Sequence, residues 1–121
     1  MNKAQAIQSF WEGFGWATYD QNTVPEDAAM PRLTYNFVSG SFNETQVPPA
    51  SLWDRTRSWK RITDKSDEIE AAIGMGGVMI PFDGGAIWIK RGSPFAQRVS
   101  DEDDSIRRIL LNIELEYISQ N

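Results

Sequence analysis

Hydrophobic residues alternate along the C-terminal part of the chain. From position 109 to 118 every odd residue is apolar or aromatic, and most even residues are polar. A period of two is typical of a strand that buries one face. The pattern therefore predicts a long strand whose core face consists of Ile109, Leu111, Ile113, Leu115 and Tyr117, and whose other face carries Leu110, Asn112, Glu114, Glu116 and Ile118.

Two earlier segments show the same alternation over shorter distances. The first runs from Arg32 to Val38, where apolar and polar side chains alternate. The second runs from Ser51 to Trp59 and is mainly polar on one side. It is predicted to place Trp53, Arg55, Arg57 and Trp59 on one face.

Helical periodicity appears in two places. From Ala4 to Trp16 the apolar residues recur every three or four positions, and Gly13 and Gly15 then favour the end of the helix. A second helix is predicted to begin with Thr63 as its N-cap and to end at Gly74. The predicted buried stripes are Ala4, Ile7, Phe10, Trp11 and Phe14 in the first helix, and Ile62, Ile69, Ala72 and Ile73 in the second.

Between the second helix and the last strand, two apolar runs, Val78–Phe82 and Ala86–Ile89, flank Asp83-Gly84-Gly85. These turn residues accept positive φ at low cost, so the pattern predicts a β-hairpin. A turn centred on Asp83-Gly84 pairs Ile80 with Ile87, and one centred on Gly84-Gly85 pairs Ile80 with Ile89. Both registers keep the same core face, made of Val78, Ile80, Phe82, Ile87 and Ile89.

The other face of this hairpin carries Met79, Pro81, Ala86 and Trp88. Proline cannot donate a ladder hydrogen bond, so Pro81 favours an edge strand or a bulge. A face this apolar is predicted to be covered by a second layer or by another subunit.

The remaining segments, 20–31, 39–49 and 92–104, carry proline, glycine or charge runs and are predicted to be loops. The expected fold is α+β and a single domain spanning residues 1–121. Its antiparallel sheet would have two helices packed on one face, in the order α-β-β-α-β-β-β.

Composition excludes several classes of chemistry. The chain has no cysteine and no histidine, which removes thiolate nucleophiles, the commonest general base and the usual zinc ligands. Its net charge of -5 argues against a dedicated nucleic-acid binder. The beginning of the sequence does not resemble a signal peptide, and no apolar run is long enough to span a bilayer, so we expect a protein made in the cytosol.

Two local features resemble binding motifs. Gly74-Met75-Gly76-Gly77 is reminiscent of a phosphate loop, but it follows a helix and enters a strand, which favours a helix cap and turn. The acidic run Asp101–Asp104 lacks the spacing of a calcium loop and is expected to be solvated. No catalytic residues, cofactor or metal site are predicted, and the protein is not expected to be an enzyme.

Three stretches carry a resemblance to a known family: residues 50–59, residues 67–74 (DEIEAAIG) and residues 80–98 (IPFDGGAIWIKRGSPFAQR). They are similar to the small tail-completion or tail-terminator proteins of long-tailed bacteriophages, which are also labelled minor capsid, minor tail or head–tail joining proteins. The resemblance covers nearly the whole chain, and it implies a structural virion protein without an active site.

In that family the subunits form a six-fold ring at the head-proximal end of the tail tube. The resemblance thus implies a homo-hexamer in the virion, made in the bacterial cytoplasm, whose partners are the tail tube protein and the head connector. DNA would pass through as cargo, and no membrane is involved. Another neck or minor capsid component, a non-catalytic oligomeric ligand-binding module, and a metal-dependent hydrolase that uses only carboxylates are the alternatives.

Three sets of contact residues are predicted for such an assembly. An acidic lumen would repel DNA phosphates and so allow passage. The candidates for subunit contacts are Met79, Pro81, Trp88, Trp53, Arg55, Arg57 and Trp59; those for contacts with neighbouring rings are Ser41, Phe42, Asn43, Glu44, Ser93, Phe95 and Arg98; and those facing the channel are Asp101, Glu102, Asp103, Asp104, Glu114 and Glu116.

Overall fold

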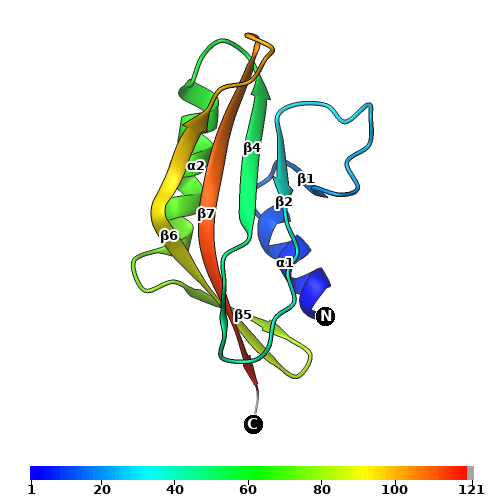
Figure 1. Cartoon of the computed structure of the whole chain (residues 1–121), viewed down its shortest axis with the longest axis vertical. Coiled ribbons are helices and arrows are strands. Elements are labelled where there is room, and N and C mark those ends of the chain that lie inside the picture. The colour runs from blue at the N-terminus through cyan, green and yellow to red at the C-terminus, as the bar shows by residue number, and fades with distance from the viewer. Residues whose placement is uncertain (120–121) are drawn as a thin grey trace.

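The structure, a computed structural model, describes residues 1–119. It is an α+β fold in which two helices accompany a curled, mostly antiparallel sheet shaped like a half-barrel (Figure 1). The elements follow in the order α-β-β-β-β-α-β-β-β: α1 Lys3–Glu12, β1 Ala17–Asp20, β2 Arg32–Tyr35, β3 Thr45–Gln46, β4 Pro49–Arg55, α2 Lys60–Ile73, β5 Val78–Phe82, β6 Gly85–Val99 and β7 Ile106–Ser119.

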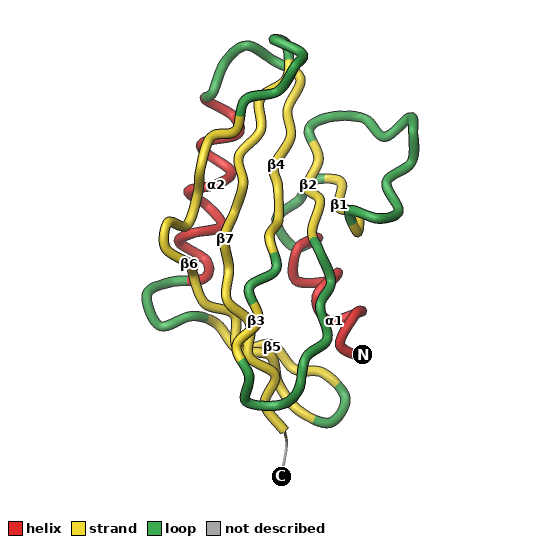
Figure 2. Tube along the Cα trace, viewed as in Figure 1, coloured by secondary structure: helices red, strands yellow, loops and turns green. Residues whose placement is uncertain are grey.

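The sheet is ordered β1-β2-β4-β7-β6-β5, with β3 pairing β7 beyond the end of β4. All strand pairs are antiparallel except β1 with β2, which is parallel. The prediction of a purely antiparallel sheet is therefore wrong at one edge. Both helices lie behind the sheet in Figure 2, and within the described residues no layer covers the face toward the viewer.

One core joins the helices to the sheet. The odd residues of β7 from Ile109 to Tyr117 are almost completely buried, as their alternation predicts, and the same core contains residues from α1, α2, β2, β4 and β6. Helix α1 also packs on β1 and β5, the two edge strands, and so lies across the open side of the half-barrel. We call the helix-covered side of the sheet the inner face and the uncovered side the outer face.

The hairpin forms with the first of the two predicted registers. Ile80 pairs with Ile87 and Phe82 with Gly85, so Asp83-Gly84 is the two-residue turn. Gly84 has a φ of 96°, which explains the preference for glycine there. The predicted core face is confirmed, and β5 is an edge strand, as Pro81 indicates.

Several predicted boundaries are wrong. The first helix ends at Glu12, before the predicted end at Trp16, and the strand from Arg32 ends at Tyr35. The strand predicted to run to Trp59 stops at Arg55, and Trp59 is instead the N-cap residue of α2. Thr63 therefore lies inside α2, and Ala72 is exposed, whereas Ile62, Ile69 and Ile73 are buried as predicted.

The segments predicted as loops contain three further pieces of strand. Strand β1 begins before the first of them and reaches Asp20, and β3 lies inside the second. In the third, β6 continues to Val99 through a register shift between Arg91 and Ala96, so only residues 100–105 connect β6 to β7. Gly92 and Pro94 thus mark a bulge within a long strand, which sequence signals alone do not distinguish from a loop.

Candidate interaction surfaces

A row of three side chains crosses the outer face near one end of the sheet. Arg32, Trp53 and Arg108 are Cα partners across β2, β4 and β7, so they project from the same face. The guanidinium carbons lie 5.7 Å (Arg32) and 4.5 Å (Arg108) from the centroid of the Trp53 ring. The indole Nε1 donates to Thr34 Oγ1 at 3.0 Å, and Arg108 donates to Ser51 Oγ through Nε and Nη2 at 3.2 and 3.1 Å. We call this row the outer stack.

A second row of the same chemistry lies on the inner face, at the start of α2. The Arg98 and Arg107 guanidinium carbons lie 4.5 and 5.3 Å from the centroid of the Trp59 ring. Arg107 also donates to the backbone carbonyls of Asp104 and Arg57, at 2.9 and 3.0 Å. This inner stack fastens the 100–105 loop and the start of α2 to β7, so it has an evident role in the fold.

The arginines of the chain fall into two groups. Four of them form ion pairs, namely Arg55 with Asp103, Arg57 with Asp104, Arg61 with Asp54 and Arg91 with Glu70. The other four belong to the two stacks, and within residues 1–119 none of these has a carboxylate oxygen within 4.0 Å. Although the chain has a net charge of -5, the four guanidinium groups without a carboxylate partner in this part of the chain all lie against tryptophan rings.

The predicted single face of two tryptophans and two arginines does not exist as such. Trp53 and Trp59 lie on opposite sides of the sheet, because the strand between them ends at Arg55. Arg55 and Arg57 both turn toward the acidic loop. The association of arginine with tryptophan is present, but it uses arginines from β2, β6 and β7, distant in sequence from both rings.

The acidic loop Asp101–Asp104 is exposed, as predicted. The Ser105 hydroxyl and backbone N–H donate to Asp103 Oδ1 at 2.6 and 2.9 Å. These hydrogen bonds, and more weakly Arg55, hold the pKa of Asp103 below its usual value. Two of its four carboxylates form ion pairs with Arg55 and Arg57. The net negative charge of the loop is therefore smaller than the sequence suggests.

Glu114 and Glu116 lie on the outer face of β7, at the end away from the outer stack. Their Cα partners on β6 are Lys90 and Trp88. The Lys90 ammonium lies 4.3 Å from the centroid of the Trp88 ring, and no ion pair to either glutamate is present in the described part of the chain. Both carboxylates are half-buried and unpaired.

The hairpin edge presents the apolar side chains that the sequence indicates. Met79 is 55% exposed and Pro81 is also exposed, while Trp88 is half-buried and its Nε1 donates to the Gly76 carbonyl at 2.9 Å. Met75, in the preceding turn, is 95% exposed. Within residues 1–119 no second layer covers these side chains, so the predicted cover would have to come from another molecule.

The 39–46 segment, which includes the predicted contact residues Ser41 and Glu44, is fastened to the rest of the fold by a lysine. The Lys3 ammonium lies 4.5 Å from the ring centroid of Tyr117, 5.2 Å from Phe42 and 5.9 Å from Phe82, and it donates to Ser39 Oγ at 3.3 Å. The backbone N–H of Asn43 donates to the Tyr117 carbonyl at 2.8 Å. The contacts of Ser39 and Asn43 therefore fix the position of the exposed tip of this segment, from Ser41 to Glu44.

Among the other predicted loop contacts, only Ser93 is exposed without another evident role. Phe95 is 8% exposed and belongs to the core, and Arg98 belongs to the inner stack. The prediction that Phe95 lies in an exposed loop is wrong because β6 continues through this region and directs its ring inward.

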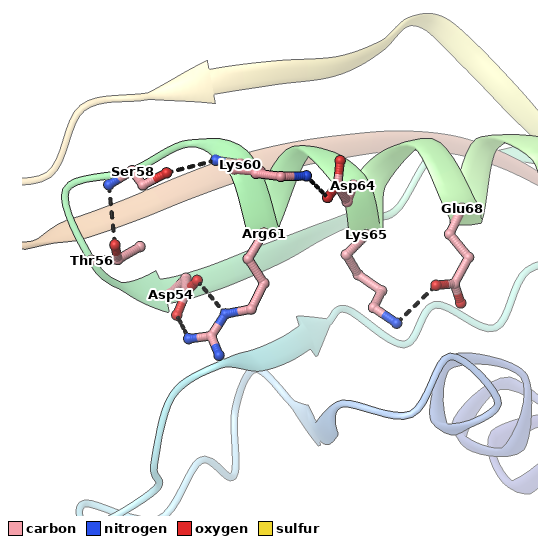
Figure 3. Close-up of a pocket in the computed structure, with 8 residues that line it drawn as sticks. All are labelled: Asp54, Thr56, Ser58, Lys60, Arg61, Asp64, Lys65 and Glu68. Carbon is pink, nitrogen blue, oxygen red and sulfur yellow. Dashed lines mark hydrogen bonds and ion pairs between the residues drawn. The ribbon is translucent and has the colours of Figure 1, made fainter.

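A groove of about 480 Å³ runs between β4 and α2 (Figure 3). At its base the Arg61 guanidinium binds the fully buried Asp54 carboxylate in bidentate fashion, at 2.8 and 2.5 Å, which raises the pKa of Arg61. Lys60 pairs with Asp64, and Lys65 with Glu68 and with the Phe14 carbonyl. Sequence reasoning missed this site, because Asp54 and Arg61 were assigned to different elements with no indication that they meet.

The charged groups of the groove bind one another, and none is placed as an activated nucleophile or base. In the part of the chain that the structure describes, no three acidic side chains are grouped so that they could hold a metal ion. No helix within residues 1–119 has the length and apolar character needed to cross a bilayer. Comparisons with protein-family models, curated proteins and solved structures return no match to this chain.

Proposed function

We propose that this protein is a structural subunit of a bacteriophage virion, a tail terminator or tail-completion protein that forms a ring at the head-proximal end of the tail tube. The observation that carries the proposal is the pair of dissimilar surfaces that one subunit leaves uncovered: the outer stack near one end of the sheet and the hairpin edge near the other. A ring is built from heterologous contacts, which need two different surfaces on every subunit.

The chemistry of the chain supports assembly in preference to catalysis. Cysteine and histidine are absent, and the charged side chains of the groove between β4 and α2 are bound to one another. Tryptophan, methionine and arginine, which are enriched in protein interfaces, are prominent on the uncovered surfaces. This composition, together with the resemblance of residues 50–59, 67–74 and 80–98, supports a hexameric ring that contacts the tail tube protein and the head connector.

The distribution of acidic side chains refines the proposal for the channel. The acidic loop is partly neutralised by Arg55 and Arg57, whereas Glu114 and Glu116 are unpaired on the outer face. Glu114 and Glu116 are therefore the stronger candidates for a lumen that repels passing DNA. Reversing both charges should slow DNA ejection from particles that assemble normally, while reversal of Glu102 should have a smaller effect.

Deletion of the gene from its phage, followed by electron microscopy, tests the proposal. Over-long tails unattached to heads are expected for a terminator. Tails of normal length that fail to join heads would instead support another neck or minor capsid component. Normal infectious particles would refute the virion role altogether.

The groove of Figure 3 favours one second candidate, an oligomeric ligand-binding module. Its volume is within the range of small-molecule sites, although its walls are more charged than is usual for such sites. Saturable binding of a small molecule that is lost in Arg61→Gln, under conditions where circular dichroism shows the variant folded, would support this candidate. Retained binding in that variant would exclude the groove as the site.

A further inference from the structure

The outer face of β7 carries unpaired charges of both signs. Arg108 has no carboxylate partner within residues 1–119, and further along the same face Glu114 and Glu116 have no cationic partner. All three side chains are half-buried, so solvent screens them less than it screens fully exposed charges. The inner face of the same strand has no comparable arrangement, since Arg107 is bound to backbone carbonyls.

These charges cannot neutralise one another inside one subunit. Arg108 and Glu114 are six residues apart on a strand, a distance of about 20 Å at the usual rise per residue. This is more than twice the screening length of about 8 Å at physiological ionic strength. Lys90, the Cα partner of Glu114, stacks on the Trp88 ring and forms no ion pair within residues 1–119, so the complementarity of Arg108 and Glu114 is available to another molecule.

We propose that the outer face binds the outer face of a second copy of this chain, with the β7 strands antiparallel and a two-fold axis running across them near Leu111. Positions 108 and 114 lie equally far from position 111, so Arg108 of each copy meets Glu114 of the other. Glu116 lies next to this contact on the same face. The interface is isologous, because the same two residues contact each other twice.

Charge selects this orientation over the other face-to-face arrangement. A two-fold axis along β7 would place the strands parallel, with Arg108 against Arg108 and Glu114 against Glu114. Like charges across an interface cost binding free energy and thus exclude wrong arrangements. Only the two-fold axis that runs across the strands places Arg108 of each copy against Glu114 of the other.

The available area makes this a weak dimer. Because the sheet is curled, contact is centred on β6 and β7, with the shorter β4 beside half of their length; this strip is roughly 45 Å long and 10–15 Å wide, or about 550 Å² per copy. Twice that area lies near the lower limit of specific interfaces, about 1,200 Å² in total. The dimer should therefore dissociate at micromolar concentrations and weaken as salt is added.

This dimer does not depend on the proposed virion role, because it is a property of the isolated protein. In a phage it would cover Glu114, Glu116 and the outer stack until the subunit reaches its place in the assembly. A negative result with the purified protein would leave the deletion experiment unaffected, and normal particles after gene deletion would leave the dimer unaffected.

Sedimentation of the purified full-length chain over micromolar to submillimolar concentrations tests the proposal. The wild type should dimerise, and both Arg108→Glu and the double variant Glu114→Lys/Glu116→Lys should dimerise at least about tenfold more weakly. Arg98→Glu and Glu102→Lys are matched controls, since Arg98 also stacks on a tryptophan but on the inner face, and Glu102 lies in the acidic loop. Both controls should dimerise like the wild type.

Mixing the two weakened variants gives the decisive result. In the mixed pair the new carboxylate at position 108 of one variant meets the new ammonium group at position 114 of the other. The unchanged Glu114 of the first variant likewise meets the unchanged Arg108 of the second, so a heterodimer should form with an affinity close to that of the wild type. Rescue by mixing also shows that both variants are folded. Failure of the mixture to associate, although circular dichroism shows both variants folded, would overturn the proposal.

A monomeric wild type at submillimolar concentration would overturn it as well. In that case binding of inorganic phosphate or of duplex DNA that is lost in Arg108→Glu would assign the unpaired guanidinium groups to an anion site instead. Wild-type dimerisation that is unchanged in both charge-reversal variants would place the interface elsewhere and would equally overturn the proposal.

Discussion

The two faces of β7 differ although they belong to the same strand. On the inner face the side chains from Ile109 to Tyr117 are less than 5% exposed and apolar or aromatic, and they share one core with residues of both helices. On the outer face Arg108, Asn112, Glu114 and Glu116 are half-buried, and no layer from residues 1–119 covers them. The inner face is accounted for by the fold of one subunit, whereas the outer face has features that the isolated fold does not require.

The two arginine–tryptophan stacks repeat this contrast. Arg107 and Arg108 are neighbours in sequence and project to opposite faces, each toward a tryptophan ring. Arg107 donates to backbone carbonyls that fix the 100–105 loop, while the hydrogen bonds of the Arg108 side chain within residues 1–119 go to the Ser51 hydroxyl. The difference indicates that stability and interaction are assigned to opposite sides of one sheet, which can be tested with paired substitutions.

Leu111→Ala should give the largest loss of stability. Leu111 is 0% exposed, so the substitution leaves a cavity in the core and should lower the free energy of unfolding by about 3 kcal/mol. The control is Leu110→Ala, next along the strand on the outer face, which should lower it by less than about 1 kcal/mol. Urea denaturation measures both, and equal losses would contradict the division between the two faces.

Arg61→Gln should have the next largest effect. It leaves the Asp54 carboxylate fully buried without its cation, and an uncompensated buried charge is strongly unfavourable. The control Arg57→Gln breaks the exposed pair with Asp104 and should not change the urea midpoint measurably. If Asp54→Asn restores stability to Arg61→Gln, the buried charge is the cause of the loss.

Arg107→Ala and Arg108→Ala should separate stability from association. Arg107→Ala loses hydrogen bonds to carbonyls as well as the Trp59 contact, so it should lower the free energy of unfolding by about 1–2 kcal/mol and leave dimerisation unchanged. Arg108→Ala should cost less than about 1 kcal/mol but weaken dimerisation. Thermal denaturation and sedimentation together test the pair, and the reverse assignment would refute it.

Much of the inner face could be predicted from the sequence because burial imposes a period on it. The alternation of β7, the stripe of Ile62, Ile69 and Ile73, and the Asp83-Gly84 turn all reflect local rules that act within one element. Each of these features is confirmed in the structure. The expected α+β class follows from them.

The errors arise where a local signal has two structural meanings. Gly92 and Pro94 interrupt a strand pattern in the same way whether a loop or a bulge follows, so β6 is longer than predicted. Trp59 continues an apparent alternation but begins α2, because Ser58, whose hydroxyl accepts from the Lys60 N–H, provides the turn. Strand β1 has too few residues to show a period, and its parallel pairing with β2 is a tertiary effect.

The interaction surfaces were only partly predictable for the same reason. The exposure of Met79 and Pro81 in the hairpin could be predicted from the alternation of side chains along the strand alone. The outer stack depends on the register of β2 with β4 and of β4 with β7, which no local pattern reports. Predicting the Asp54–Arg61 pair likewise requires knowing where β4 ends and where α2 begins.

The acidic loop between β6 and β7 provides the smallest expected effect, a pH dependence. Because hydrogen bonds lower the pKa of Asp103 below the ordinary 3.8, the carboxylate contributes stability that is fully present above that ordinary value and is lost as the pH falls through the lowered one. The side chain is exposed, so the change in overall stability should be slight, and the titration of its carboxyl carbon by NMR is the better measurement. Ser105→Ala should raise the midpoint more than Arg55→Gln does, because the Ser105 hydroxyl is the largest cause of the shift. The opposite order would show that the ion pair with Arg55, at the end of β4, controls the loop.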